Sequence, residues 1–187
     1  RAANITVDHF YWYGFEWPAL RAVLQATDTG WRVDVSGDHA SGQVRVPYAF
    51  TSGSPLMLNM DTLWLQRRVV AGAAQAKGAT LNPRALPSIQ AEIKQFKVGD
   101  HDFGALQLAA RSTEQGIEID QIHLTGGTFN GIGHGRWVDT TSGLQGAIAL
   151  TLDSHDVRAT LNQMNYGEAI SGKRGKLIAD LQWSGGL

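Results

Sequence analysis

The six histidines are the residues in this chain best suited to chemistry, and their spacing argues against a local metal site. No two of them lie two, three or four positions apart, as a pair of ligands on one strand or helix would require. In Asp100-His101-Asp102, neighbouring side chains would point to opposite faces of a strand, and the adjacent Gly99 indicates a solvated turn. Cysteine is absent, which removes thiolate ligands, cysteine nucleophiles and disulfides. We therefore expect no metal and no cofactor.

Two other stretches resemble catalytic motifs but lack the required context. Gly131-Ile132-Gly133-His134-Gly135 is followed by neither a helix nor a Lys-Ser/Thr pair, so a bent strand is favoured over a phosphate-binding loop. Ser154-His155-Asp156 are adjacent, whereas triad members normally meet from distant positions, and the start of a helix explains them better. We expect no catalytic residue and no enzymatic activity.

The amino-acid composition limits the remaining classes of fold and function. The chain has 187 residues with 16 basic and 17 acidic side chains, which predicts one folded domain and argues against nucleic acid as a partner. Charged residues make up only 18%, so disorder is not expected. No apolar run is long enough for a membrane-spanning helix. Because the chain starts at Arg1, we expect a piece of a longer protein whose anchoring segment lies elsewhere.

Alternation of apolar and polar residues is the main structural signal. Short alternating runs are separated by turns rich in glycine, which accounts for 22 residues. Leu20, Ala22 and Leu24 share one face of a strand, for example, whereas Arg32 and Asp34 lie opposite Trp31 and Val33 on the next. The pattern predicts a mainly β fold of antiparallel strands with one apolar face and one face in water.

One helix is expected, near residues 154–166. Ser154 is its candidate N-cap, Val157, Leu161 and Met164 recur at helical spacing, and Gly167 provides the stop. Residues 66–84 form an Ala/Gly-rich stretch, for which a loop is favoured over a weak helix because Gly72 and Gly78 interrupt it.

The chain also resembles itself. Residues 17–35, shifted by 86 positions, align Trp17 with Phe103 and Gly30 with Gly116. We therefore expect two β-units, at 1–65 and 85–187, joined by the 66–84 loop into one continuous domain.

Several short sequence motifs resemble those of a known protein family. They are Asn82-Pro83-Arg84-Ala85-Leu86-Pro87 before a strand, Asp102-Phe103-Gly104-Ala105-Leu106, Gly135-Arg136-Trp137, and Gly172-Lys173-Arg174-Gly175 before an alternating strand. Together with Gly42-Gln43-Val44-Arg45-Val46-Pro47, they are similar to the YhdP branch of the AsmA-like proteins, which are related to TamB and to the bridge-like lipid-transfer proteins. The resemblance covers nearly the whole chain and implies a segment near the C-terminal end. Asn82 stands where Asp is expected and Phe103 where Leu is usual.

The resemblance implies a long curved antiparallel sheet that forms a gutter, anchored to the inner membrane and extending through the periplasm. The apolar groove would shield phospholipid acyl chains during transport between the inner and outer membranes. The helix residues Val157, Leu161 and Met164 would either cap this groove or complete the core. The candidate groove-lining residues are Leu20, Ala22, Leu24, Trp31, Val33, Val44, Val46, Leu58, Ile93, Leu106, Leu108, Ile117, Ile119, Ile148, Leu150, Leu177 and Leu181.

Two other functions fit the same pattern. A structural or adhesive β-domain would pack two sheets face to face and cover every apolar residue. A carbohydrate-binding β-module would instead expose Trp12, Trp17 and Trp31 as a platform of coplanar rings.

Overall fold

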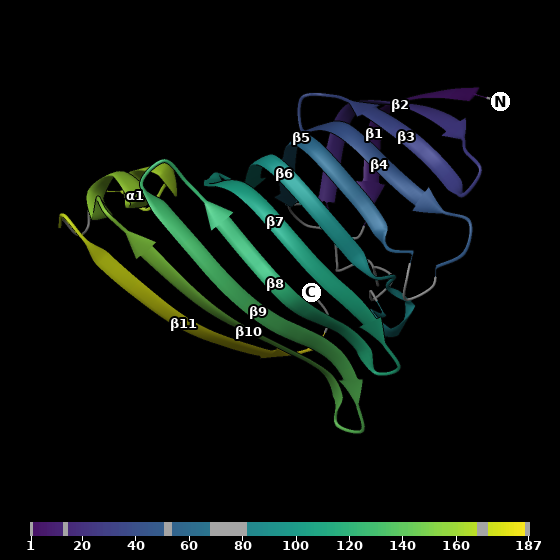
Figure 1. Cartoon of the computed structure of the whole chain (residues 1–187). Helices are drawn as coiled ribbons and strands as arrows, with labels where there is room; N and C mark the ends of the chain where they lie inside the picture. The colour runs from purple at the N-terminus through teal and green to yellow at the C-terminus, as the bar shows by residue number, and fades with distance from the viewer. Residues whose placement is uncertain (1, 13–14, 51–53, 68–81, 168–171, 186–187) are drawn as a thin grey trace, which may run out of the picture.

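A single open sheet forms the molecule (Figure 1). The computed structural model describes residues 2–12, 15–50, 54–67, 82–167 and 172–185. The strands are β1 (Ala2–Trp12), β2 (Phe15–Ala26), β3 (Gly30–Ser36), β4 (Ala40–Pro47), β5 (Leu56–Arg67), β6 (Ile89–Val98), β7 (His101–Thr113), β8 (Gly116–Thr125), β9 (Phe129–Thr140), β10 (Gly143–Ser154) and β11 (Gly175–Ser184). A short 3-10 helix, η1 (Pro83–Ala85), precedes β6, and the helix α1 (Val157–Gln163) lies between β10 and β11. The prediction of a mainly β fold with one short helix is confirmed.

The order of the strands in the sheet is their order in the sequence. Neighbouring strands are antiparallel, except that β5 and β6 are parallel. Because these two strands run in the same direction, the last residue of β5 and the first residue of β6 lie at opposite ends of the strand pair. This parallel pair is the one departure from the predicted antiparallel sheet.

The pairing register aligns the alternating apolar residues in rows that cross the sheet. The middle row consists of Leu24, Val33, Val44, Leu58, Ala91, Leu108, Ile122, Gly133, Leu150 and Ala179. A second row consists of Ala22, Val35, Gly42, Met60, Ile93, Leu106, Leu124, Gly131, Leu152 and Leu177. We call the face that carries these rows the inner face and the opposite face the outer face.

Bulges keep the apolar side chains on the inner face where the alternation breaks. In β5, Leu58 and Met60 are followed by Leu63 and Leu65, three positions after Met60, and all four belong to the same apolar cluster. The register of β4 against β5 shifts at Ser41/Gly42, and that of β6 against β7 shifts after Ile93. A bulge inserts an extra residue and bends the strand, so these shifts preserve the face and add curvature.

The strand ends form two different rims. The glycine rim carries the hairpins β2–β3, β7–β8 and β9–β10, which share the sequence Thr-x-x-Gly. In each hairpin the threonine hydroxyl donates to the glycine carbonyl, as from Thr113 to Gly116 at 3.1 Å. At Gly116, φ is +152° and an added Cβ would lie 2.3 Å from the carbonyl oxygen of Trp137, so only glycine fits there. The helix rim, at the other strand ends, carries α1.

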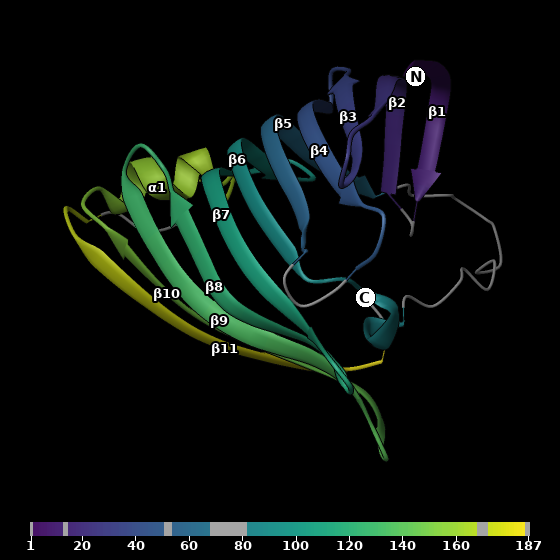
Figure 2. The same ribbon diagram turned by 45° about the vertical axis from the view of Figure 1, so that its right-hand side comes forward.

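The sheet is curved, and both short helices lie on its concave side (Figure 2). Met164, which follows α1, belongs to the apolar cluster of the inner face, and Leu86, which follows η1, packs against Ala110, Ile117 and Trp137. The inner face is therefore the concave face, as expected of a gutter.

The helix is shorter than the sequence predicted. It covers Val157–Gln163 in place of residues 154–166, and Asp156 is its N-cap, with a carboxylate that accepts a hydrogen bond from the amide of Ala159 at 3.0 Å. Ser154 is wrong as the N-cap, because β10 extends through it and its hydroxyl is hydrogen-bonded to Thr160 at 2.7 Å.

Other boundaries also differ from those predicted. Gln66 and Arg67 belong to β5, and residues 83–85 form η1, whereas the remainder of the predicted 66–84 loop lies, apart from Asn82, outside the described residues. The second unit begins its sheet at Ile89. Gly131–Gly135 lies within β9, as the strand interpretation requires. The aligned segments of the internal repeat lie in the hairpins β2–β3 and β7–β8, which share the Thr-x-x-Gly turn.

The glycine rim provides a stability test. Substitution Gly116→Ala should lower the free energy of unfolding by about 2–3 kcal/mol, because the added methyl group meets backbone. Gly127→Ala is the matched control, because the nearest atom to its added Cβ is the side-chain oxygen of Gln163 at 3.9 Å. Urea denaturation measures both, and equal stability of the two variants would contradict the turn geometry.

Candidate functional site

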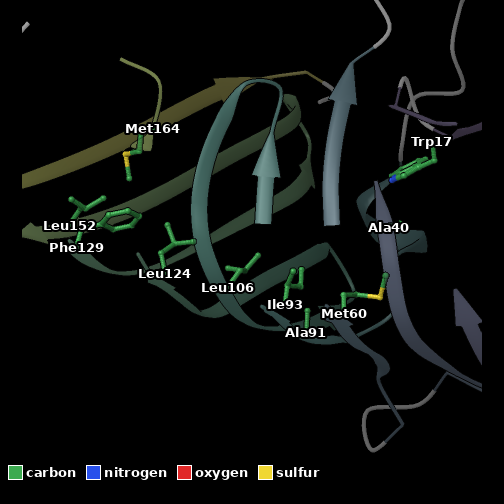
Figure 3. Packing of buried hydrophobic residues seen from close by; sticks show 10 residues of the cluster. All are labelled: Trp17, Ala40, Met60, Ala91, Ile93, Leu106, Leu124, Phe129, Leu152 and Met164. Carbon is green, nitrogen blue, oxygen red and sulfur yellow. The ribbon is translucent and has the colours of Figure 1, made fainter. Parts of the chain in front are cut away.

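A continuous apolar cluster runs along the inner face (Figure 3). Its buried members come from β2, the β3–β4 region, β5 to β10 and the end of α1, and their side chains lie on the same side of the sheet. They are Trp17, Ala40, Met60, Ala91, Ile93, Leu106, Leu124, Phe129, Leu152 and Met164. The cluster thus spans most of the width of the sheet without a polar interruption among its members.

Among the described residues, much of this apolar face lacks a second layer. Leu58, Leu108 and Leu150 of the middle row are only half-buried, and on the last strand Leu177 and Leu181 are each 56% exposed. Among the described residues, the only elements outside the sheet are α1 and η1, which lie near opposite rims. A sandwich would have covered these side chains with another sheet, so the described residues do not fit that alternative.

The candidate groove-lining residues all lie on the inner face by register. They differ in exposure: Ile93, Leu106 and Ile117 are buried, whereas Trp31 is 40% exposed near the glycine rim. Several buried residues of this face are absent from the predicted lining set. Among them are Met60, Ala91, Ala110, Leu124, Phe129, Trp137 and Leu152.

The pattern contained signals for some of the missed residues. Met60, Ala91 and Leu152 each lie two positions from a predicted lining residue, namely Leu58, Ile93 and Leu150, and so continue the same alternation. Leu124 lies beyond a register shift in β8 that breaks the period of two, and Phe129 follows a turn. No local signal marks Phe129 as a core residue that is only 1% exposed.

On the helix rim, α1 is held against the inner face by one apolar and one polar anchor. Met164 is 6% exposed and packs into the cluster near Phe129 and Leu152. Thr160 is 3% exposed, and its hydroxyl lies 2.7 Å from both the Ser154 and the Thr128 hydroxyls. Of the helix residues predicted from the sequence, Val157 and Leu161 are only half-buried, so Thr160 and Met164 provide the main anchors.

His101 strengthens this attachment. Its Nδ1 lies 2.5 Å from the backbone oxygen of Met164, and its ring stacks on Tyr166 with centroids 4.8 Å apart. The expectation of a solvated turn at residues 100–102 is therefore wrong for His101 and Asp102, which are half-buried at the start of β7. Histidine serves here in packing the segment after α1.

On the glycine rim, η1 covers a smaller apolar cluster formed by Ala110, Ile117 and Trp137. Pro83 is almost fully buried, and Arg84 forms an ion pair with Asp139 at 3.3 Å. These contacts hold the start of the β6 segment over the ends of β8 and β9. They close the corner of the inner face nearest to Trp137.

The outer face is mostly polar and carries exposed ion pairs, although Ile132 and Ile178 are also exposed there. Lys94 pairs with Asp61 at 2.7 Å, and the hydrogen bond together with the charge of Asp61 raises the pKa of Lys94. Arg111 pairs with Asp120 at 2.9 Å and with Glu118, and the hydrogen bond to Asp120 is the main reason that the pKa of Arg111 is raised. Such exposed pairs contribute little to stability, and they mark the side of the sheet that water solvates.

The described residues form no group of three or more histidine, aspartate or glutamate side chains that could hold a metal ion. Trp17 is 6% exposed, so it cannot offer a ring to a glycan platform together with Trp31, and the side chain of Trp12 lies outside the described residues. The described residues therefore do not form the platform of exposed, coplanar rings that the carbohydrate-binding alternative requires.

The anchors of α1 generate a prediction. Met164→Ala should raise the hydrogen-exchange rates of the α1 amides by roughly 30-fold, because a seven-residue helix is not stable without its packing. The β8 and β9 amides should change little. Arg158→Ala, an exposed position on the same helix, is the control, and unchanged exchange in the Met164 variant would contradict the anchoring role.

Comparisons with known proteins complete the description of the chain. No curated protein and no solved structure matches it. Among the described residues, no helix has both the length and the apolar character needed to cross a membrane. The family model described as YhdP protein matches residues 1–187, the whole chain. The chain therefore belongs to the YhdP family, as the sequence resemblance indicated.

Proposed function

We propose that this chain is a segment of a periplasmic bridge-like protein whose concave inner face shields phospholipid acyl chains between the inner and outer membranes. The observation that carries the proposal is the continuous apolar cluster of the inner face together with Leu58, Leu108 and Leu150 of the middle row, which are only half-buried among the described residues. Family membership supports it, because the sequence resembles a family of bridge-like lipid-transfer proteins. The role is not enzymatic.

The energetic need for such a surface is large. Each methylene group of an acyl chain costs about 0.8 kcal/mol in water, so a chain of about sixteen carbons faces on the order of 12 kcal/mol. Aliphatic side chains that line the whole path replace this water. Since they need only present methyl groups, the function is distributed over many positions and requires no single polar residue.

The sheet is long and wide enough to hold acyl chains along its inner face. Its 11 strands, spaced by about 4.8 Å, extend for roughly 48 Å along the rows, and the 13 residues of β7 span about 40 Å from rim to rim. Acyl chains would follow the rows from strand to strand, whereas the polar headgroups would project past the rims. The inner surface thus offers a lipid a succession of equivalent positions.

Helix α1 narrows the path at one place. It covers the inner face over Leu124, Phe129 and Leu152 on the helix rim, so lipids passing β8 to β10 would lie nearer to the glycine rim. Toward that rim the inner face of β9 carries Gly133, Gly135 and then the buried Trp137. Side chains of β10 lie against both glycines, because an added Cβ would lie 3.1 Å from Leu150 at Gly133 and 2.9 Å from Ile148 at Gly135.

A charge on the inner face tests the proposal. Leu108→Glu in the full-length protein should lower the amount of phospholipid that co-purifies with it, because a carboxylate would have to be desolvated among acyl chains. Native mass spectrometry after gentle purification measures the bound lipid, and circular dichroism checks that the variant is folded.

Gln107→Glu is the matched control, because Gln107 is exposed and points to the outer face of the same strand. It should retain the lipid. Equal lipid content in the two folded variants, or a wild-type protein that carries no lipid, would overturn the proposed function.

A further inference from the structure

Outside the apolar face, two arginines stand directly opposite each other on the outer face. Arg32 of β3 and Arg45 of β4 are register partners, so their side chains emerge side by side. Like charges in directly opposed positions destabilise a pair of strands. This arrangement therefore calls for a compensating negative charge.

The protein supplies only part of that charge. The buried Nε of Arg32 lies 3.5 Å from a carboxylate oxygen of Asp34 without forming a hydrogen bond to it, and a terminal nitrogen of the guanidinium donates to the side-chain oxygen of Gln25. Arg45 is exposed and donates only to Gln43, at 3.2 Å. Within the described part of the chain, Arg45 has no acidic partner, so the pair retains a net positive charge.

A cavity of about 420 Å³ opens at these arginines. Besides Arg32 and Arg45 it is lined by the hydroxyl-bearing residues Thr27, Thr29 and Ser54 and by the apolar Met57, and no carboxylate is among its described lining residues. We call it the arginine pocket. Because Thr27 and Thr29 belong to the β2–β3 turn, the pocket lies beside the glycine rim.

The wall of the arginine pocket is held in place before any ligand binds. Tyr48 donates through its hydroxyl to the carbonyl of Thr27 at 3.0 Å and through its amide to the carbonyl of Thr29 at 3.2 Å. Its ring also packs edge-on against Trp31, with centroids 6.0 Å apart. A rigid wall lowers the entropy cost of binding a small ligand.

We propose that the arginine pocket binds a phosphate-bearing group. Guanidinium groups bind phosphate oxygens through paired hydrogen bonds, and threonine and serine hydroxyls can donate to the remaining oxygens. A cavity of this size accommodates a phosphate with a small substituent. The source of the phosphate is either a soluble ion or a lipid headgroup, and both present the same oxygens to the arginines.

This inference goes beyond the proposed function, because the pocket binds through arginines of the outer face; its lining includes Trp31 and Val46 of the inner face but none of the buried cluster. A chain without a lipid path could still bind phosphate here. Conversely, an apolar groove could carry acyl chains whether or not the pocket is occupied.

The test is a titration of the whole chain with inorganic phosphate at constant ionic strength, followed by nuclear magnetic resonance of the arginine Nε–H groups and the Thr27–Gly30 amides. Saturable shifts are expected in the wild type. Arg45→Gln should weaken the affinity by about tenfold, and Arg45→Lys, which keeps the charge but loses the planar fork, should recover only part of it.

Arg136→Gln is the matched control. Arg136 is an exposed arginine of β9 beside another cavity, but that cavity has no second arginine. Its loss should leave the affinity unchanged. Shifts that do not saturate, or an equal loss of affinity in the Arg136 and Arg45 variants, would overturn the proposal.

A second experiment distinguishes a soluble phosphate ion from a lipid headgroup as the ligand. Flotation with vesicles of phosphatidylcholine alone or with added phosphatidylglycerol shows whether a headgroup is bound. Binding that Arg45→Gln abolishes supports a lipid headgroup, whereas saturable binding of inorganic phosphate without flotation supports a soluble ligand. Absence of both would overturn the proposal.

Discussion

The structure depends on one constraint: every strand must place its apolar side chains on the same face of a single curved sheet. A slip of one residue between two strands would move a whole set of apolar side chains into water. The unbroken middle row from Leu24 to Ala179 shows that the register is kept through every pairing, including the parallel one. Where the alternation fails, as after Met60 and Ile93, bulges restore the face and bend the sheet toward it.

The same constraint explains why the rims differ. In a single sheet that is buried on one side, the ends of the strands must be fixed by local contacts. These contacts differ between the two rims. The glycine rim uses repeated Thr-x-x-Gly turns, whereas the helix rim uses Met164 and a small network of hydroxyl groups around Thr160. With the rims fixed, Leu58, Leu108 and Leu150 in the middle of the sheet are only half-buried, and no second layer covers them in the part of the chain that the structure describes.

Much of this could be predicted from the sequence, because alternation is local. The strands, the apolar face and the lining residues followed from a period of two, and the family resemblance supplied the curvature. The parallel pairing of β5 and β6 could not be predicted, since it depends on where the chain returns after Arg67. The roles of Thr160, His101 and Phe129 could not be predicted either, because each depends on contacts with residues distant in sequence or across a turn.

The most direct test of the account is site-specific photocrosslinking in cells that make the full-length protein. A photoreactive residue is placed in turn at Ala147, Ile148, Ala149 and Leu150 of β10, and the crosslinked products are analysed for phospholipid. The account predicts lipid adducts at Ile148 and Leu150 but not at Ala147 and Ala149, following the alternation of the strand. Adducts without this alternation, or inner positions that crosslink only to protein, would contradict it.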